Sequence, residues 1–85
     1  MKTNLTSDKN FDVIDKHSRL TAISNFIRVY RVDSGITQQQ LSEQSNLHRN
    51  TIINAESAKN ITLLSLFELL DALDVSPEEL FQDFK

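Results

Sequence analysis

Three polar residues, Arg49, Asn50 and Asn54, have the kind of side chain that reads base pairs. An arginine can donate two hydrogen bonds to O6 and N7 of guanine, and an asparagine can pair at two points with N6 and N7 of adenine. Ile53, in the same stretch, offers an apolar contact for a thymine methyl group. We predict that these residues form a base-contacting row on an exposed helix. The alternative is a set of ordinary solvated residues.

Two short helices joined by a tight turn, between residues 35 and 56, would position this row. Thr37 and Gln40 have the spacing of a capping box, in which each side chain bonds to the other residue's backbone amide. Ile36 precedes the cap as a hydrophobic staple, and the second helix covers residues 49–56. The residues that we expect to point inward are Leu41, Leu47, Ile52 and Ala55.

Three further helices are predicted around this pair. The first covers residues 18–34, because apolar residues recur there at helical spacing, and Gly35 follows it as a left-handed C′ residue. Thr62 caps a fourth helix, which has a wide apolar face. Ser76 and Pro77 begin a fifth, which buries Leu80, Phe81 and Phe84. We predict a compact five-helix, all-α domain over residues 18–85, after a partly flexible N-terminal arm of residues 1–17.

The composition excludes several classes of protein. The chain has 85 residues and no cysteine, so a disulfide scaffold and a cysteine-ligated zinc site are both ruled out. No apolar run approaches the roughly 20 residues that cross a membrane, and the polar N-terminus is unlike a signal peptide. His17 and His48 have no carboxylate at metal-ligand spacing. We predict a cytoplasmic protein that is not an enzyme and uses no metal or cofactor.

The charge is unevenly distributed along the chain. The formal net charge is −3, whereas a nucleic-acid-binding protein is expected to be basic. Residues 1–16 hold three lysines and three aspartates, residues 17–60 have a net charge of +2, and residues 61–85 have a net charge of −5. We therefore expect the acidic C-terminal part to face away from DNA. The salt dependence of a monomer should be modest.

Residues from about 19 to 84 resemble the phage-repressor and Cro-type (XRE) helix-turn-helix family of bacterial and phage DNA-binding proteins. The resemblance rests on five segments in order: IRVYR, then GITQ, LSEQSNL, TIINAE and finally ITLLSLFELLDALDVSPEELF. It implies a five-helix repressor-like fold in which the second and third helices form the helix-turn-helix. It also implies transcriptional regulation through double-stranded DNA.

The resemblance implies a role for particular residues. Arg49, Asn50 and Asn54 match positions that read base edges. Arg31 and Glu56 match a structural ion pair between the first helix and the recognition helix. The positions that match phosphate contacts are Gln38, Thr51, Lys59 and Asn60, the last through its amide.

A dimer is expected, because one monomer offers too little surface and charge for operator affinity. A two-fold dimer places two recognition helices about 34 Å apart, one turn of DNA. The resemblance and the surplus of Leu and Phe put the dimer interface on the last helix, at Leu80, Phe81 and Phe84. The function that we predict is a homodimeric repressor on an inverted-repeat operator.

Two residues depart from the family pattern. His48 takes the N-cap of the recognition helix, where Ser or Thr is usual, and histidine is a poorer cap. It could donate to a phosphate, or it could be an ordinary exposed histidine. Ala58 stands where the loop after the recognition helix usually has glycine.

The N-terminal arm lies outside the resemblance. Its apolar residues Phe11, Val13 and Ile14 lie next to charges, while Phe26 and Val29 fall off the buried stripe of the first helix. One hypothesis is that the arm covers Phe26 and Val29, within one chain or across a dimer. The other is a disordered arm with scattered apolar residues.

A second function stays open, that of a protein-interaction module. An antitoxin-like protein of this family would bind a toxin-like or other basic partner through its acidic C-terminal part, with weak DNA binding or none. Loss of DNA binding in Arg49→Ala or Asn54→Ala, with the fold intact, would favour the regulator. A gene for a basic protein next to this one would favour the partner role.

Overall fold

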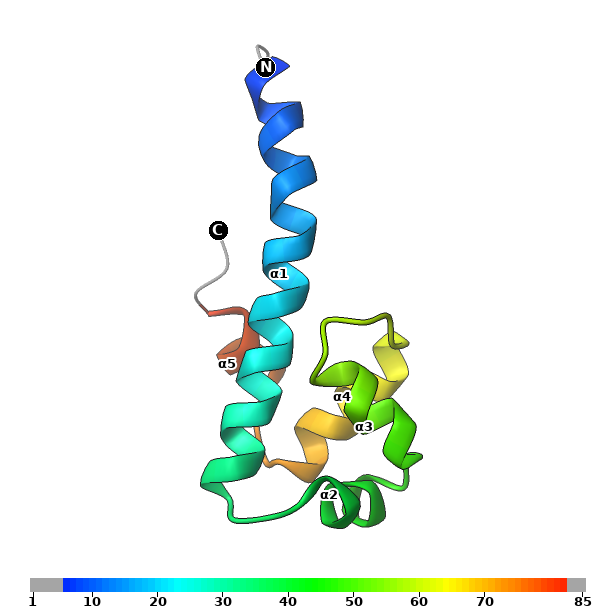
Figure 1. Ribbon diagram of the computed structural model, residues 1–85. Helices are drawn as coiled ribbons and strands as arrows, with labels where there is room; N and C mark the ends of the chain where they lie inside the picture. Colours follow the sequence, from blue (N-terminus) through cyan, green and yellow to red (C-terminus); the bar gives the residue numbers. More distant parts are fainter. Residues whose placement is uncertain (1–5, 83–85) are drawn as a thin grey trace.

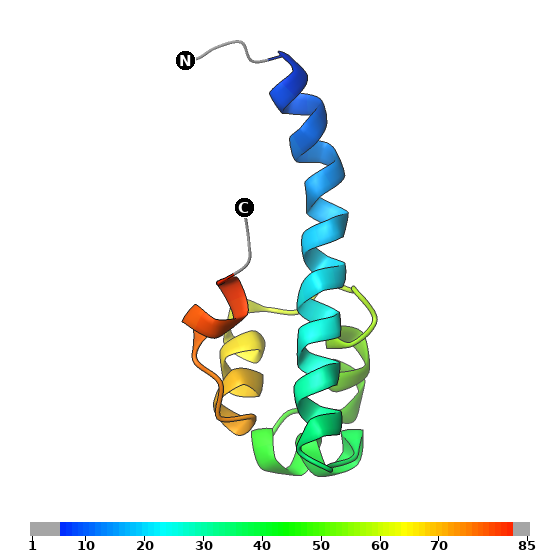
Figure 2. The same ribbon diagram turned by 90° about the vertical axis from the view of Figure 1, so that its left-hand side faces the viewer.

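The described part of the chain, residues 6–82 of a computed structural model, begins with one long helix, α1 (Thr6–Asp33). Side chains are described from residue 16 onward. The helix has 28 residues and a length of about 42 Å at 1.5 Å per residue. No glycine or proline precedes Gly35, so nothing in the sequence interrupts it. Its N-terminal half projects beyond the other helices (Figures 1 and 2).

The start of α1 differs from the sequence prediction. The helix begins at Thr6 rather than near Ser18, because the prediction followed the apolar stripe and the residues before it have no such stripe. The side chains of Phe11, Val13 and Ile14 lie outside the described residues. Their backbone, however, belongs to the same continuous helix as Phe26, at least about 18 Å away along its axis. The arm therefore cannot cover Phe26 within one chain, and cover across a dimer stays a prediction.

Four short helices follow α1 and pack beside its C-terminal half: α2 (Gln38–Ser45), α3 (Arg49–Ala55), α4 (Leu63–Ala72) and α5 (Pro77–Phe81). In Figure 2, α4 and α5 lie on one side of α1 and α3 lies on the other, with α2 across the bottom. α2 packs against both α3 and α4. Across residues 6–82 every regular element is a helix, which confirms the all-α prediction.

The core lies where these helices meet. Five apolar side chains are completely buried: Ile27 of α1, Leu41 of α2, Ile52 of α3, and Leu69 and Leu70 of α4. Partly buried residues surround them, and the staple residue Ile36 and the turn residue Leu47 are both among these. Phe26, expected outside the buried stripe, also packs against the core, and its ring lies 4.5 Å from that of Tyr30 between centroids.

The predicted helix boundaries rest on capping groups that the structure contains. The hydroxyl of Thr37 accepts from the Gln40 amide at 3.0 Å, and the Thr37 amide donates to the Gln40 side chain at 2.8 Å. Thr62 caps α4, and Ser76 forms a second capping box at the start of α5. Gly35 has a φ of +74°, which an L-residue rarely adopts.

The fifth helix corrects one predicted set of buried residues. Leu80 is 3% exposed and belongs to the core, whereas Phe81 is 42% exposed. α5 has only five residues, so its single turn can direct one large side chain inward and leaves its neighbour at the surface. Phe84 lies outside the described residues.

Candidate nucleic-acid interface

The turn between α2 and α3 is fixed by hydrogen bonds and by one apolar contact. Asn46 ends α2 in the left-handed region, with a φ of 63°, and its amide donates to the Ser42 carbonyl. The Leu47 amide donates to the same carbonyl at 3.2 Å, and the Ser42 hydroxyl donates to the Leu47 carbonyl. The Leu47 side chain packs against the core. The angle between the two helices is therefore held from both sides of the turn.

α3 presents one apolar side and one polar side. Ile52 and Ala55 face the core, at 0% and 3% exposure. Arg49 and Asn50 are exposed, and Ile53 is 37% exposed. Thr51 and Asn54 are half-buried at the edges of this face. The structure therefore places all the predicted base-reading side chains on one short helix that has an open side.

The polar side chains on this open side are available to a ligand. Within the described residues, the side chains of Arg49, Asn50 and Asn54 make no hydrogen bond or ion pair with the rest of the chain. The N-cap residue His48 is exposed and makes no side-chain capping bond, as expected of histidine. α3 therefore depends on the core and on its neighbours for its position.

An ion pair ties α3 to α1. The Arg31 guanidinium donates to both Glu56 oxygens, from Nε at 2.6 Å and from Nη2 at 3.0 Å, and Nη1 donates to the Ile36 carbonyl at 2.9 Å. The side chains are 13% and 4% exposed. The hydrogen bond to Glu56 raises the pKa of the Arg31 guanidinium. The predicted pairing is present, and it joins α1, the start of α2 and the end of α3.

Gln38, a predicted phosphate contact, belongs to the same network. Its Nε2 donates to Glu56 at 3.2 Å, and the residue is half-buried at the first position of α2. An amide nitrogen carries two hydrogens, so the bond to Glu56 leaves one for an outside acceptor. The ion pair thus also orients the side chain of Gln38, for which we predict a contact with a DNA phosphate.

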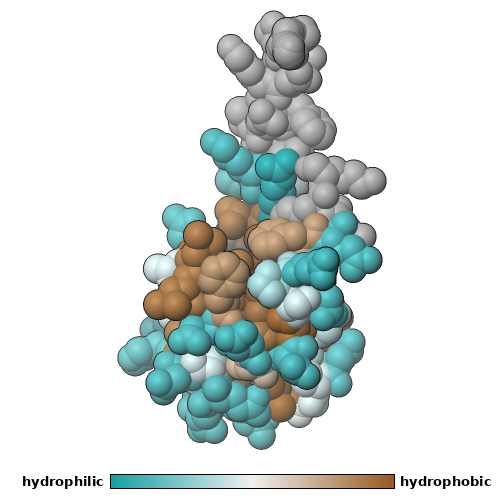
Figure 3. Space-filling model, turned by 180° about the vertical axis from the view of Figure 1, so that it is seen from behind, coloured by the Kyte–Doolittle hydropathy of each residue, from teal (hydrophilic) through white to brown (hydrophobic). Residues whose placement is uncertain are grey.

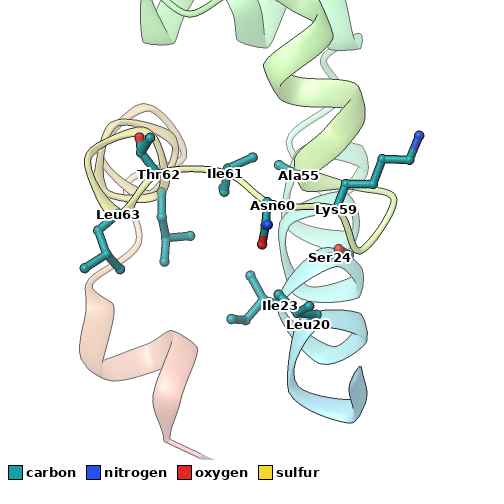
Figure 4. A pocket seen from close by; sticks show the side chains of 10 residues that line it. Leu20, Ile23, Ser24, Ala55, Lys59, Asn60, Ile61, Thr62 and Leu63 are labelled. Atoms are coloured by element: carbon teal, nitrogen blue, oxygen red, sulfur yellow. The ribbon is translucent and has the colours of Figure 1, made fainter. Parts of the chain in front are cut away.

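The loop between α3 and α4 carries the other predicted phosphate contacts, Lys59 and Asn60, which are both exposed. They do not point the same way: Figure 4 shows Lys59 directed away from the neighbouring cavity and Asn60 directed toward Ile23. Ala58 before them has a φ of 59°. For an L-residue the left-handed region costs roughly 1–2 kcal/mol, so the loop keeps the usual glycine conformation without the glycine.

Ser24 of α1 is the residue that the sequence analysis missed. It is 4% exposed, and its hydroxyl oxygen accepts a hydrogen bond from the Ala58 amide at 2.7 Å. A serine in a helix usually reads as a solvated residue, although Ser24 follows Leu20 by four residues and precedes Ile27 by three, so helical spacing does place it on the buried stripe. The departure at Ala58 was the one indication that this loop needs a special contact.

A second surface of the chain is apolar. Four large side chains of α4 and α5 are exposed: Leu63 at 71%, Leu64 at 70%, Phe67 at 43% and Phe81 at 42%. Figure 3 shows a hydrophobic patch on this side of the molecule, with hydrophilic residues below it. We call these four residues the apolar face. Leu80, predicted at the dimer interface, is buried within one chain and is not available to a partner, whereas Phe81 is partly exposed.

The charged residues are also divided between α3 and the helices of the apolar face. The five acids between residues 68 and 79 are all exposed and all belong to α4, α5 or the turn between them: Glu68, Asp71, Asp74, Glu78 and Glu79. The cations Arg49 and Lys59 lie on α3 and on the loop after it. α3 therefore presents neutral and positive groups, while the acids are concentrated on the helices that carry the apolar face.

The described residues form neither a metal site nor a membrane-spanning helix. No three His, Cys, Asp or Glu residues gather there as a metal site would require. None of the helices in that part of the chain is both long and apolar enough to cross a membrane.

The fixed turn, the ion pair behind it and the open polar side of α3 define a helix-turn-helix DNA-binding protein. A family model described as helix-turn-helix matches residues 27–80, and the chain belongs to this family of XRE-type regulators. It is therefore a DNA-binding transcriptional regulator, in a family of regulators rather than of enzymes. A search of curated proteins found no significant match.

Solved structures of the restriction-modification controller protein C.Esp1396I resemble this chain at 34% sequence identity over 75% of its length. The wild-type protein superposes with a TM-score of 0.68 and is covered over 86% of its chain. The tetramer with its natural 35-base-pair operator gives 0.69 and 86%. The same protein bound to a 19-base-pair duplex gives 0.69 and 87%.

Proposed function

We propose that this chain is a homodimeric repressor that binds an inverted-repeat operator through α3 of each copy. One observation carries the proposal: Arg49 and Asn50 lie exposed on a firmly held helix, with no described partner in their own chain. Buried side chains and the Arg31–Glu56 ion pair hold the helix, while its outward polar side chains bond to no described residue. A major groove supplies acceptors and donors for such groups.

The proposed contacts divide into two kinds. The residues that read base edges are Arg49, Asn50, Asn54 and Ile53. Those that contact phosphates are Gln38, Thr51, Lys59 and Asn60. Phosphate contacts fix the register of a protein on DNA, while base contacts carry the sequence information. The acids of α4 and α5 lie outside both sets, which supports an orientation with these two helices away from the duplex.

The second copy is proposed to sit on the apolar face. The apolar face exposes four large apolar side chains, and soluble monomers rarely leave such a patch open to solvent. These side chains belong to Leu63, Leu64, Phe67 and Phe81. C.Esp1396I is described on its operator as a tetramer, which supports assembly of more than one copy here. Phe84 is proposed to add to this contact, and the N-terminal arm is proposed to cover Phe26 and Val29 of the second copy. Deleting residues 1–16 should then dissociate the dimer, and an unchanged dimer would remove the arm from it.

The test is selection of bound fragments from a random duplex pool, at low and at physiological salt. We expect an inverted repeat to be enriched by the wild-type chain. Arg49→Ala should lose the enrichment. Arg49→Lys should keep affinity for DNA in general but lose discrimination at one base pair, since lysine keeps the charge without the two-point fork.

Lys16→Ala is the matched control, because it removes one exposed positive charge far from α3. It should leave the selected sequence unchanged. No enrichment by the wild-type chain even at low salt would overturn the proposal. A further trial is the promoter of a restriction-modification gene pair, which the likeness to C.Esp1396I makes the first natural operator to test.

The alternative is an antitoxin-like module whose basic partner protein binds α4 and α5. The observation that favours it is the exposed acids beside the apolar face. A basic partner would compete with the second copy for this face. Co-expression with the product of a neighbouring gene tests it, and a complex that survives Arg49→Ala would support it. In either role we propose a cytoplasmic protein.

A further inference from the structure

The loop between α3 and α4 holds a conformation that its own sequence does not favour. Ala58 is left-handed, with a φ of 59°, although alanine disfavours this region and glycine does not. The next residue, Lys59, takes its direction from that peptide. A strained residue persists only where the surrounding structure holds it in place. The contacts of this loop show which group does so.

Two backbone bonds and two side-chain bonds hold the loop, one of the latter from the Ser57 hydroxyl to the Ile53 carbonyl at 2.6 Å. The amides of Ser57 and Lys59 both donate to the Asn54 carbonyl at 3.1 Å, which ties the loop to its own helix. The amide of Ala58 turns the other way and donates to the Ser24 hydroxyl at 2.7 Å. Ser24 lies 34 residues earlier in the chain, on α1. It therefore supplies the bond that ties the left-handed residue to another part of the fold.

Close packing does not replace this bond. A cavity of about 140 Å³ lies between the loop and α1, lined on one side by Leu20, Ile23 and Ser24 and on the other by residues 59–63. Figure 4 shows the space between Ile61 and Ile23, with Ser24 beneath the loop near Lys59. Because the loop is open on this side, loss of the bond would leave its backbone free to move toward the cavity.

Ser24 differs from the other buried polar residues. The Ser45 hydroxyl bonds within its own helix, to the Ser42 carbonyl, and Glu56 is held by Arg31. The Ser24 hydroxyl instead spans from α1 to the loop. A buried hydroxyl needs a hydrogen-bond partner. The bond from the Ala58 amide to Ser24 is the only described bond between this peptide and a side chain.

We propose that Ser24 is a positioning residue for DNA binding, which acts by holding Ala58 so that Lys59 is aimed at a phosphate. The inference rests on the proposed function, because the phosphate contact of Lys59 belongs to it. Without the serine oxygen, Ala58 relaxes toward ordinary backbone angles and Lys59 loses its fixed direction. Binding must then order the loop, and that ordering reduces affinity.

The test compares operator affinity over a range of salt concentrations for Ser24→Ala, Lys59→Ala and the double variant. Ser24→Ala should weaken binding about tenfold at physiological salt and reduce the slope of log K against log salt by the share of two phosphates, one for each copy in the dimer, which is roughly 1.8. Lys59→Ala should do the same. The double variant should be no weaker than Lys59→Ala alone, because both substitutions remove one contact.

Rescue separates positioning from general support of the fold. Ser24→Thr keeps the hydroxyl and places its methyl group at the cavity, so it should restore the salt slope. Exchange of the Ala58 amide hydrogen should be fast in Ser24→Ala and slow in Ser24→Thr. Melting of each variant is measured first, and binding is compared at a temperature where all are folded.

Each outcome decides the matter. A full salt slope in folded Ser24→Ala, or a double variant whose losses add, would overturn the role of Ser24 while operator binding itself stands. Wild-type protein that binds no operator would overturn the proposed function and this inference together. In that case the Ala58 exchange would still show whether the serine holds the loop.

Discussion

α3 and the start of α4 both expose side chains to solvent, but the two surfaces fit different kinds of partner. On α3 the exposed groups are an arginine and an asparagine that have no described partner, beside one isoleucine. On α4 they are Leu63 and Leu64, at 71% and 70% exposure. Exposed polar side chains on a helix with an open side suit a hydrogen-bonding ligand, while exposed leucines favour a protein surface. In the proposed function, the fold thus separates the nucleic-acid contact from the protein contact.

The two surfaces also differ in what holds them. α3 is short, has a poor N-cap, and depends on the Arg31–Glu56 pair and on Ile52. α4 has a proper cap at Thr62 and a row of buried leucines of its own. We therefore expect α3 to be easier to displace than α4, and substitutions should affect the two surfaces separately.

The largest effect is expected for Glu56→Ala. Removing the carboxylate leaves Arg31 buried and Gln38 without its acceptor, so the free energy of unfolding should fall by about 3 kcal/mol. Urea unfolding measures it. Glu43→Ala, at an exposed position of α2, is the control and should change stability by less than about 0.5 kcal/mol. A loss below about 1 kcal/mol for Glu56→Ala would show that α3 does not depend on this pair.

The next largest effect concerns the apolar face. Leu64→Glu should weaken the dimer by about 2 kcal/mol, roughly thirtyfold, since it puts a charge in a surface that must dehydrate. Sedimentation over a concentration series gives the dissociation constant. Val32→Glu, a similar change at a 57% exposed residue of α1, should leave the dimer intact. Equal dimerisation in both variants would place the second copy elsewhere.

A smaller effect of opposite sign is expected for Ala58→Gly. Glycine adopts the left-handed region without strain, so the substitution should raise stability by about 1 kcal/mol. Thermal melting measures the change. Ala22→Gly, in the exposed part of α1, provides the comparison and should instead lower stability. A loss of stability at both sites would mean that the loop is not strained.

The smallest effect is a change with pH at the contact between α1 and α5. The Tyr30 hydroxyl donates to Glu79 at 3.2 Å, and this hydrogen bond raises the pKa of Tyr30 above its ordinary value of 10.0. The unfolded chain therefore loses this proton first. The contribution to stability is present below about pH 10 and is lost as the pH rises through the raised pKa.

Melting temperatures measured between pH 9 and pH 11 should show this loss of stability in the wild-type chain. The Tyr30→Phe variant should not show the part of the loss that comes from the tyrosine. The chain has one tyrosine and no tryptophan, so tyrosinate absorbance follows the same group directly. A Tyr30 that titrates at its ordinary pKa would show that the hydrogen bond to Glu79 does not form in solution.

Much of the fold could be predicted, because its signals are local. A capping box indicates the start of a helix within four residues, and the structure has both: Thr37 with Gln40, and Ser76 with Glu79. The inward positions of α3 follow from helical spacing. The Arg31–Glu56 pair was implied by family resemblance, since residues 25 apart give no local sign of contact.

The rest depended on contacts that no local pattern reports. The bond from Ser24 to Ala58 joins residues 34 apart, so helical spacing can place Ser24 on the buried side of α1 but cannot show its partner. The early start of α1 was missed because a helix can continue without an apolar stripe when nothing breaks it. Leu80 and Phe81 are adjacent and both apolar, so only the packed single turn of α5 decides which one is buried.

The open side of α3 also bears on how such a protein can evolve. Arg49 and Asn50 are exposed and bond to nothing described in their own chain, so exchanging them removes no support from the fold. A gene duplicate could therefore acquire a new operator through one or two mutations and remain folded throughout. If Arg49 and Asn50 read the operator as proposed, recognition in this scaffold changes independently of stability, which favours families of close relatives that read different DNA sequences.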